Sequence, residues 1–161
     1  MKALPSLVIL LSMLAVAVIL PLMAEQSKSP SQRAGAPRIG LVLHPDDFDG
    51  YGCRLQWPDD YWKSNARNFF VSNAEEEAIM NIDGVDLRMY RIGFDAGGSI
   101  KGSHSVDRYR KDEIEVHVDF VITKRCSPDD ENCEVTLFDA VVTVMRGLSK
   151  RTIKTKGICG S

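Results

Sequence analysis

The sequence predicts an all-β protein, built as a small antiparallel sandwich or open barrel of about six to seven strands. Three observations indicate this fold class. Several stretches alternate apolar and polar residues with period two, the dipeptide Asp83-Gly84 separates two such stretches, and the 161-residue chain holds four cysteines, enough for two disulfides. The strands fall into two meander blocks, 67–92 and 113–159, within a single domain covering residues 38–161.

The residues that precede this domain indicate export from the cytosol. Lys2 comes before a long apolar run that ends at the small residue Ala24, as in a secretory signal peptide covering residues 1–24. An uncleaved membrane anchor is the alternative, because the run is nearly long enough to span a bilayer. Residues 25–37 are polar and rich in proline and serine, which predicts a flexible linker. The domain is therefore expected to be periplasmic or secreted.

The dipeptide Asp83-Gly84 predicts a hairpin with a two-residue turn, which requires positive φ at both positions. Such a turn pairs the flanking residues, and the pairs on one face are all apolar. These pairs are Ile82 with Val85, Met80 with Leu87, and Ala78 with Met89. The acidic residues of this stretch are therefore interpreted as turn and strand-entry residues, and not as a metal or catalytic centre.

A second hairpin is predicted from residues 113–124 and 135–146, which are rich in alternating and β-branched residues. Its expected pairs are apolar on both strands. They are Ile122 with Phe138, Phe120 with Ala140, Val118 with Val142, and Val116 with Val144. A bulge is expected between Cys133 and Phe138, where the register must change by one residue.

A third strand of this block follows the expected turn 147–150 and pairs Val144 with Ile153. Lys154 and Lys156 alternate along this strand with inward-facing residues. The alternation favours a solvated outer face over a polyanion-binding patch.

The hairpin registers also indicate how the cysteines pair. Cys126 and Cys133 face each other at the open end of the second hairpin, at a spacing suited to a disulfide. By elimination Cys53 pairs with Cys159, which would join the last strand to the start of the domain. The acidic residues between Cys126 and Cys133 then lie in an exposed turn. The alternative for this turn is a weak calcium site formed by Asp129, Asp130 and Glu131.

Two segments without a strand pattern hold the candidate binding residues. The second half of residues 44–67 has three large aromatic side chains that either plug one end of the fold or form an exposed surface for sugars or a partner protein. These are Trp57, Tyr61 and Trp62. Residues 93–112 are rich in glycine and predict a long loop, either a binding surface or a disordered insertion. Its tip offers charge and an aromatic ring, which are common at binding hot spots, in Arg108, Tyr109 and Arg110.

Composition and motifs favour binding over catalysis. The formal net charge of −2 becomes −3 when Lys2 leaves with the signal peptide, which points away from nucleic acid and anionic membrane surfaces. No serine lies in a nucleophile-elbow motif. We therefore expect a non-catalytic binding or envelope-associated module, without a cofactor, that recognises a protein or another cell-envelope component. Contact with the membrane is expected only if the N-terminal segment stays uncleaved.

The alternative function is a small metal-dependent hydrolase. Its candidate residues are His44, Asp47 and Asp49, of which the two aspartates and Gly50 match part of a calcium loop. The other acidic ligands of such a loop are missing from the sequence. Measurement of bound zinc or calcium in the purified protein would separate this alternative from a non-catalytic module.

Two short stretches resemble known proteins. The run AIMNIDGVDLRM and the closing KGICG are similar to a family of small exported bacterial β-proteins without an assigned function. The hairpin pattern A-x-M-x-I-D-G-V-x-L also resembles the periplasmic inhibitors of C-type lysozyme, which are small disulfide-clipped β-barrels. The Ser-Gly-x-x-Tyr stretch of those inhibitors has only an approximate counterpart in Gly102-Ser103-His104-Ser105 and Tyr109. No inhibitory residue is therefore carried over to this chain.

Overall fold

The computed structural model describes residues 35–45, 48, 52–61, 67–125 and 134–160. The predicted signal peptide, nearly all of the predicted linker and the predicted Cys126–Cys133 bridge lie outside these residues. So does the alternative calcium site at Asp129, Asp130 and Glu131. Among the residues that are described, no helix is long and apolar enough to cross a membrane.

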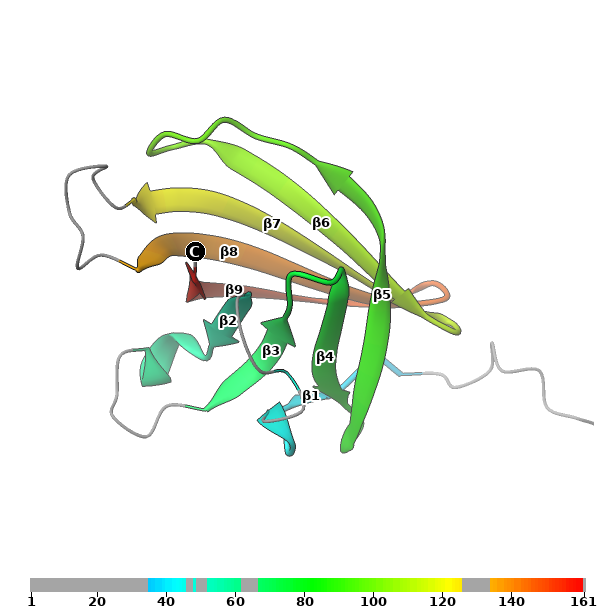
Figure 1. The fold of residues 1–161 in the computed structure, drawn as a ribbon. Helices are drawn as coiled ribbons and strands as arrows, with labels where there is room; N and C mark the ends of the chain where they lie inside the picture. Colours follow the sequence, from blue (N-terminus) through cyan, green and yellow to red (C-terminus); the bar gives the residue numbers. More distant parts are fainter. Residues whose placement is uncertain (1–34, 46–47, 49–51, 62–66, 126–133, 161) are drawn as a thin grey trace, which may run out of the picture.

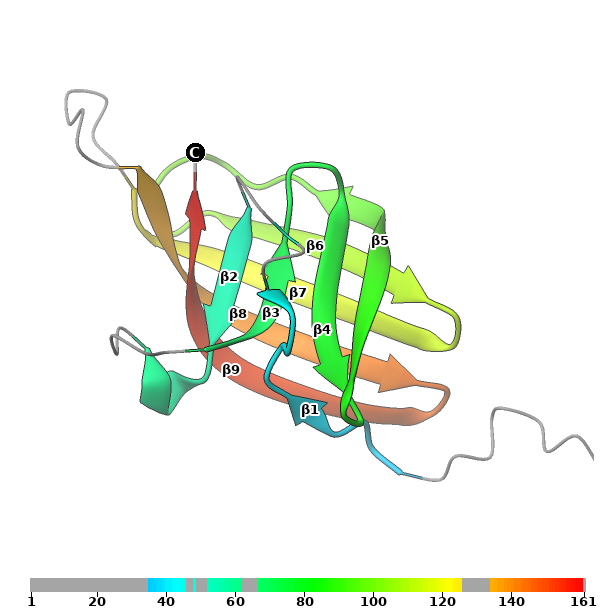
Figure 2. The same cartoon turned by 60° about the horizontal axis from the view of Figure 1, so that its bottom comes forward.

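The described residues form strands and one short 3-10 helix, which confirms the all-β prediction. The elements are β1 (Ile39–Gly40), β2 (Cys53–Gln56), η3 (Pro58–Asp60), β3 (Asn68–Ser72), β4 (Glu77–Ile82), β5 (Val85–Asp95), β6 (His104–Lys111), β7 (Ile114–Lys124), β8 (Val135–Arg146) and β9 (Ser149–Gly160). Strands β6 to β9 are long and form one wall of the molecule (Figure 1). The shorter strands β2 to β4 cross in front of this wall when the molecule is turned (Figure 2).

Strands β2 to β9 close into an antiparallel barrel. Strands β3 to β9 form one continuous meander, and β2 pairs with both β9 and β3 to close it. β1 is an extra strand that pairs with β4 through Ile39 and Gly40. Closure corrects the predicted sandwich or open barrel of fewer strands, and its physical advantage is that a closed barrel leaves no unpaired edge.

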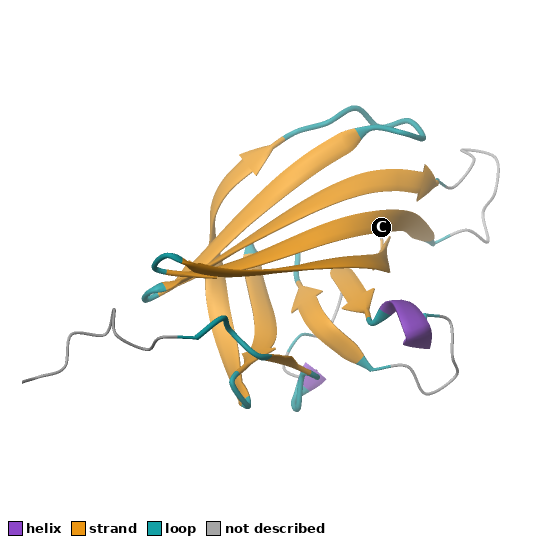
Figure 3. Ribbon diagram, turned by 180° about the vertical axis from the view of Figure 1, so that it is seen from behind, coloured by secondary structure: helices purple, strands orange, loops and turns teal. Residues whose placement is uncertain are grey.

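The barrel interior is filled with side chains. Inward positions of β7, β8 and β4 are apolar, and β2 and β3 add Leu55 and Phe70, both fully buried. β5 joins the two walls, because residues 85–90 pair with β4 and residues 90–95 pair with β6. Seen from behind, the long strands run side by side and η3 lies beyond one end of β2 (Figure 3). The outer face of β6 to β9 is therefore the longest uninterrupted sheet surface of the barrel.

A second, smaller core lies outside the barrel. Val42 and Phe48, from the segment before β2, are buried against Val71 and Ile79 on the outer face of β3 and β4. The carboxylate of Asp86 accepts hydrogen bonds from the backbone N–H groups of residues 43 and 44 at 2.8 and 2.9 Å. Residues 38–45 and Phe48, which follow the predicted linker, therefore pack against the outside of the barrel, and we call them the N-terminal strap.

Asp83, in the turn between β4 and β5, contacts both this strap and the end of β8. Its carboxylate accepts a hydrogen bond from the Arg38 N–H at 3.0 Å, and it forms an ion pair with Arg146 at the end of β8, at 2.5 Å. The hydrogen bond from Arg146 lowers the pKa of the Asp83 carboxyl below its usual value. The turn between β4 and β5 thus holds the N-terminal strap and the β8 end together.

The predicted hairpin registers are confirmed for β4 with β5 and for most of β7 with β8. The bulge in the second hairpin is misplaced, because the register shifts between Ile122 and Lys124 on β7 and not on the other strand. The register of β9 is also wrong by two residues: Val144 pairs with Arg151. The cause is a tighter turn, in which Arg146 pairs with Ser149.

The predicted loop 93–112 is mostly strand. β5 extends to Asp95 and β6 begins at His104, so only residues 96–103 connect them. The period-two signal is hidden in β6, because two of its inward residues, Ser105 and Asp107, are polar. A search for alternating apolar residues therefore misses this strand.

Replacement of Gly84 by valine is expected to lower the free energy of unfolding by at least ~1 kcal/mol, measured by urea titration. Asp83 and Gly84 have φ values of 56° and 89°, as the predicted turn requires, and a β-branched residue is strained in this region. Gly84→Asn is the matched control, since asparagine tolerates positive φ, and we expect it to lose less than half as much. Equal losses for both variants would contradict this reading of the turn.

Candidate functional site

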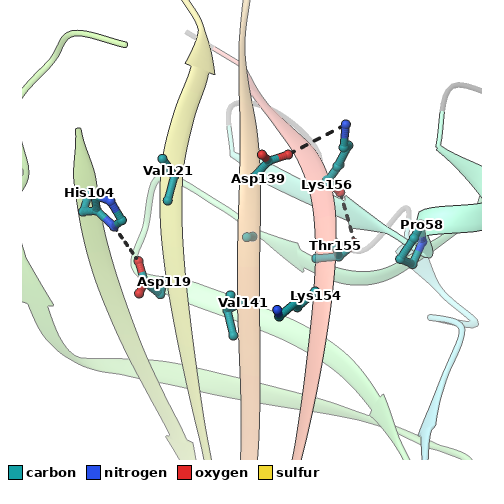
Figure 4. Close-up of a pocket in the computed structure, with 10 residues that line it drawn as sticks. Pro58, His104, Asp119, Val121, Asp139, Val141, Lys154, Thr155 and Lys156 are labelled. Carbon is teal, nitrogen blue, oxygen red and sulfur yellow. Dashed lines mark hydrogen bonds and ion pairs between the residues drawn. The ribbon is translucent and has the colours of Figure 1, made fainter. Parts of the chain in front are cut away.

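A groove of about 470 Å³ lies over the outer face of β6 to β9. Figure 4 shows its side chains, which come from all four strands, together with Pro58 of η3 at one margin. A volume of this size is in the range of ligand-binding pockets. The groove is the candidate functional site because it combines this volume with polar groups on rigid strands.

The strand registers align the groove residues in two rows across the sheet. One row is His104, Val121, Asp139 and Lys156, and the next is Asp119, Val141 and Lys154, with Val106 of β6 beside it but outside the groove. Side chains in both rows point away from the barrel interior, since their neighbours along each strand fill the core. The two rows therefore place apolar, acidic and basic groups side by side on one surface.

The charges of the groove are arranged by strand. Asp119 and Asp139 lie on the central strands, and the two lysines lie on β9. The His104 Nδ1 is 3.4 Å from the Asp119 Oδ1, and the Lys156 Nζ is 3.9 Å from the Asp139 Oδ1. The side chain of Lys154 forms no ion pair or hydrogen bond with any residue that the structure describes. One cation of the groove is thus available to a ligand.

The predicted aromatic residues divide between core and groove. Trp57 packs against Phe69 with ring centroids 4.8 Å apart, as the interpretation of a plug predicts. Tyr61 lies beside the groove, where the Lys156 Nζ is 5.7 Å from the centre of its ring. Trp62 lies outside the described residues. Of the two described residues, Trp57 and Tyr61, it is therefore Tyr61 that lies near the candidate site.

The structure corrects the predicted loop position of Arg108, Tyr109 and Arg110, whose role in binding stays a prediction. These residues belong to strand β6, and Tyr109 faces the barrel interior with 2% of its surface exposed. Arg108 forms an ion pair with Asp95, and Arg110 pairs with Glu115 at 2.7 Å. Alternation along the strand turns the aromatic ring inward and both arginines outward, so the three cannot form one surface.

Tyr109 takes part in a polar network at one end of the barrel. Its hydroxyl donates a hydrogen bond to Asp107 at 3.3 Å, and the Asp107 carboxylate is 3.5 Å from the Arg91 guanidinium. Burial raises the pKa values of Asp107 and Tyr109, whereas a hydrogen bond to Glu76 raises the pKa of Arg91. Asp107 Oδ1 is buried without a hydrogen bond, and the Arg91 charge compensates it. We interpret this network as structural, because its charges face one another.

Sequence reasoning missed most groove residues. The pairs Asp119 with Val141 and Val121 with Asp139 follow from the predicted hairpin register, but that register was used only for the inward apolar residues. Their neighbours on β6 and β9 could not be predicted, because β6 was expected to be a loop and the predicted register of β9 was wrong by two residues. The signal for this site is therefore the register of four strands together, and not a motif.

The residues of the alternative metal site are only partly described. Asp47 and Asp49 lie outside the described residues, and the His44 N–H donates to Asp86. Among the residues that are described, no group of histidine, cysteine, aspartate and glutamate could hold a metal ion. The metal-dependent alternative therefore stays a prediction.

The candidate site is supported by its own geometry and not by likeness to known proteins. The resemblance to small exported β-proteins and to lysozyme inhibitors stays a prediction from short stretches of sequence. No protein-family model matches the chain, and no curated protein or solved structure matches it.

Proposed function

We propose that this protein is an exported, non-catalytic binding module that holds part of a macromolecular partner in the groove over β6 to β9. The observation that carries the proposal is the combination of an apolar floor, at Val121 and Val141, with acidic and basic side chains around it. Ligand sites typically combine apolar contact area with a few polar groups that orient the ligand. The partner is a protein or another component of the cell envelope.

The scaffold supports binding without rearrangement. The groove residues lie on strands whose inner faces are fully packed, and β9 is joined to β2 by the Cys53–Cys159 disulfide. A site on rigid strands loses little conformational entropy when it binds. This preorganisation favours a binding surface over a surface that is merely solvated.

Export is supported by two features. The N-terminal sequence has the pattern of a signal peptide, and the Cys53–Cys159 disulfide confirms the predicted pairing. Disulfides persist mainly in oxidising compartments such as the periplasm and the extracellular space. We therefore propose that the partner is met in one of these compartments.

A photo-crosslinking residue at position 141 is expected to capture the partner. Benzoylphenylalanine would replace Val141 in the purified chain, which is then irradiated in an envelope or culture-medium extract of the native host. The expected result is an adduct of defined mass that disappears when excess unmodified protein competes.

The matched control places the same residue at Met145, on the same strand and the same outer face but outside the groove. We expect no competed adduct at this position. Identical adducts at both positions, or no competed adduct at either, would contradict binding in the groove.

A further inference from the structure

We infer, on the basis of the proposed function, that the groove binds an extended segment of a partner protein with a particular residue pattern. In this pattern a basic, an apolar and an acidic residue occupy positions i, i+2 and i+4. The basic residue faces Asp119, the apolar residue rests on Val121 and Val141, and the acidic residue faces Lys154.

The width of the groove fits a segment of this length. Neighbouring strands are about 4.8 Å apart, so Asp119 on β7 and Lys154 on β9, two intervals apart, are separated by about 10 Å. In an extended peptide, side chains at i and i+4 point to the same side and lie about 13 Å apart. The ends of the segment therefore lie about 3 Å further apart than Asp119 and Lys154, a difference that the long, flexible side chains of a lysine and a glutamate can take up.

The charges of the groove are complementary to a segment with unlike ends. The Asp119 side chain, which neighbours the imidazole of His104, is 47% exposed, so a cation can approach its carboxylate from solvent. Lys154 lies at the opposite margin without a partner among the described residues. A ligand with two basic or two acidic ends would meet a like charge at one margin.

The centre of the groove favours an apolar residue in the middle of the bound segment. Val141 lies in the same row as Asp119 and Lys154 and between them, and Val121 is its diagonal neighbour. Both valines are half-buried, so a leucine placed over them removes further apolar surface from water. A serine at this position of the ligand would remove much less.

The test uses the peptide acetyl-Lys-Thr-Leu-Thr-Glu-amide, titrated into the ¹⁵N-labelled protein and followed by NMR. The expected result is saturable shifts at the amides of Val121, Val141 and Lys154. The same peptide with serine in place of leucine should bind at least about threefold more weakly. Equal binding of both peptides, or no saturable shift, would overturn the inference.

A second test of the inference reverses a charge in the groove. Lys154→Glu is expected to raise the Kd for this peptide about three- to tenfold and to lower the Kd for acetyl-Lys-Thr-Leu-Thr-Lys-amide. Lys150→Glu is the matched control, since Lys150 lies on the same face of β9 outside the groove, and should change either Kd less than about twofold. An equal effect of the two variants would overturn the inference.

The outcomes separate this inference from the proposed function. If the peptides fail while the competed adduct at position 141 persists, the groove binds a partner of other chemistry and only the inferred pattern is wrong. If the same amides shift with protein concentration alone, the occupant is a second copy of the chain, which also overturns the pattern. If peptides and adduct both fail, the proposed function fails with it.

Discussion

The double substitution Cys53→Ala and Cys159→Ala is expected to lower the free energy of unfolding by about 4 to 5 kcal/mol. The disulfide joins residues 106 positions apart, so its removal restores most of the conformational freedom of the unfolded chain. The bridge also joins β9 to β2, the strand that closes the barrel. Urea titration measures the loss, and the slope of the transition should increase because the unfolded chain exposes more surface.

The matched control is the double substitution Cys126→Ala and Cys133→Ala. The predicted bridge between these residues closes a short loop, so the same entropy argument predicts a smaller loss, of roughly half the size. A loss below about 1 kcal/mol for the Cys53 and Cys159 variant would show that closure of the barrel is independent of the disulfide. A larger loss for the control would contradict the dependence on loop length.

Gly157→Val is expected to lower the free energy of unfolding by at least ~3 kcal/mol, at the upper end of overpacking effects. Gly157 is buried on β9 opposite Leu55. A Cβ atom at this position would lie 2.5 Å from the carbonyl oxygen of Arg54 and 2.3 Å from the Leu55 Cδ2. The side chain of Leu55 can move, but the carbonyl belongs to the paired backbone, so β2 and β9 would have to separate.

Thermal and urea unfolding of three variants tests this explanation. Gly35→Val is the control, because a Cβ atom there meets nothing within 4 Å, and it should leave stability unchanged. Adding Leu55→Ala to Gly157→Val removes the side-chain contact and leaves the backbone contact, so the double variant should stay destabilised. Full recovery in the double variant would show that the backbone contact is unimportant.

Short-range patterns in the sequence were sufficient for several features. The turn at Asp83-Gly84 and the apolar pairs beside it predict the β4–β5 register, which the structure confirms. Alternation in β7 and β8 predicts most of their register, and the Cys53–Cys159 pairing follows from elimination. The two registers depend on turn chemistry and on side chains that alternate along neighbouring strands, and both are visible within about 30 residues of sequence.

The closure of the barrel could not be predicted from such short-range patterns. β2 spans only Cys53–Gln56, too short for a visible alternation, and one of its two partners, β9, is distant in sequence. β6 has polar inward residues because Asp107 is compensated by Arg91 on the neighbouring strand. A polar residue in a barrel interior is acceptable only when its partner is in place, and that partner is set by the tertiary structure.

The composition of the candidate site also depends on the tertiary structure. Asp119, Val141 and Lys154 are ordinary outward residues of three separate strands, and none belongs to a motif. The sequence determined which side chains face outward, because alternation in a strand assigns the face of each residue. Only the tertiary structure decided which of them lie side by side, because a shift of two residues in β9 preserves the face and changes every neighbour.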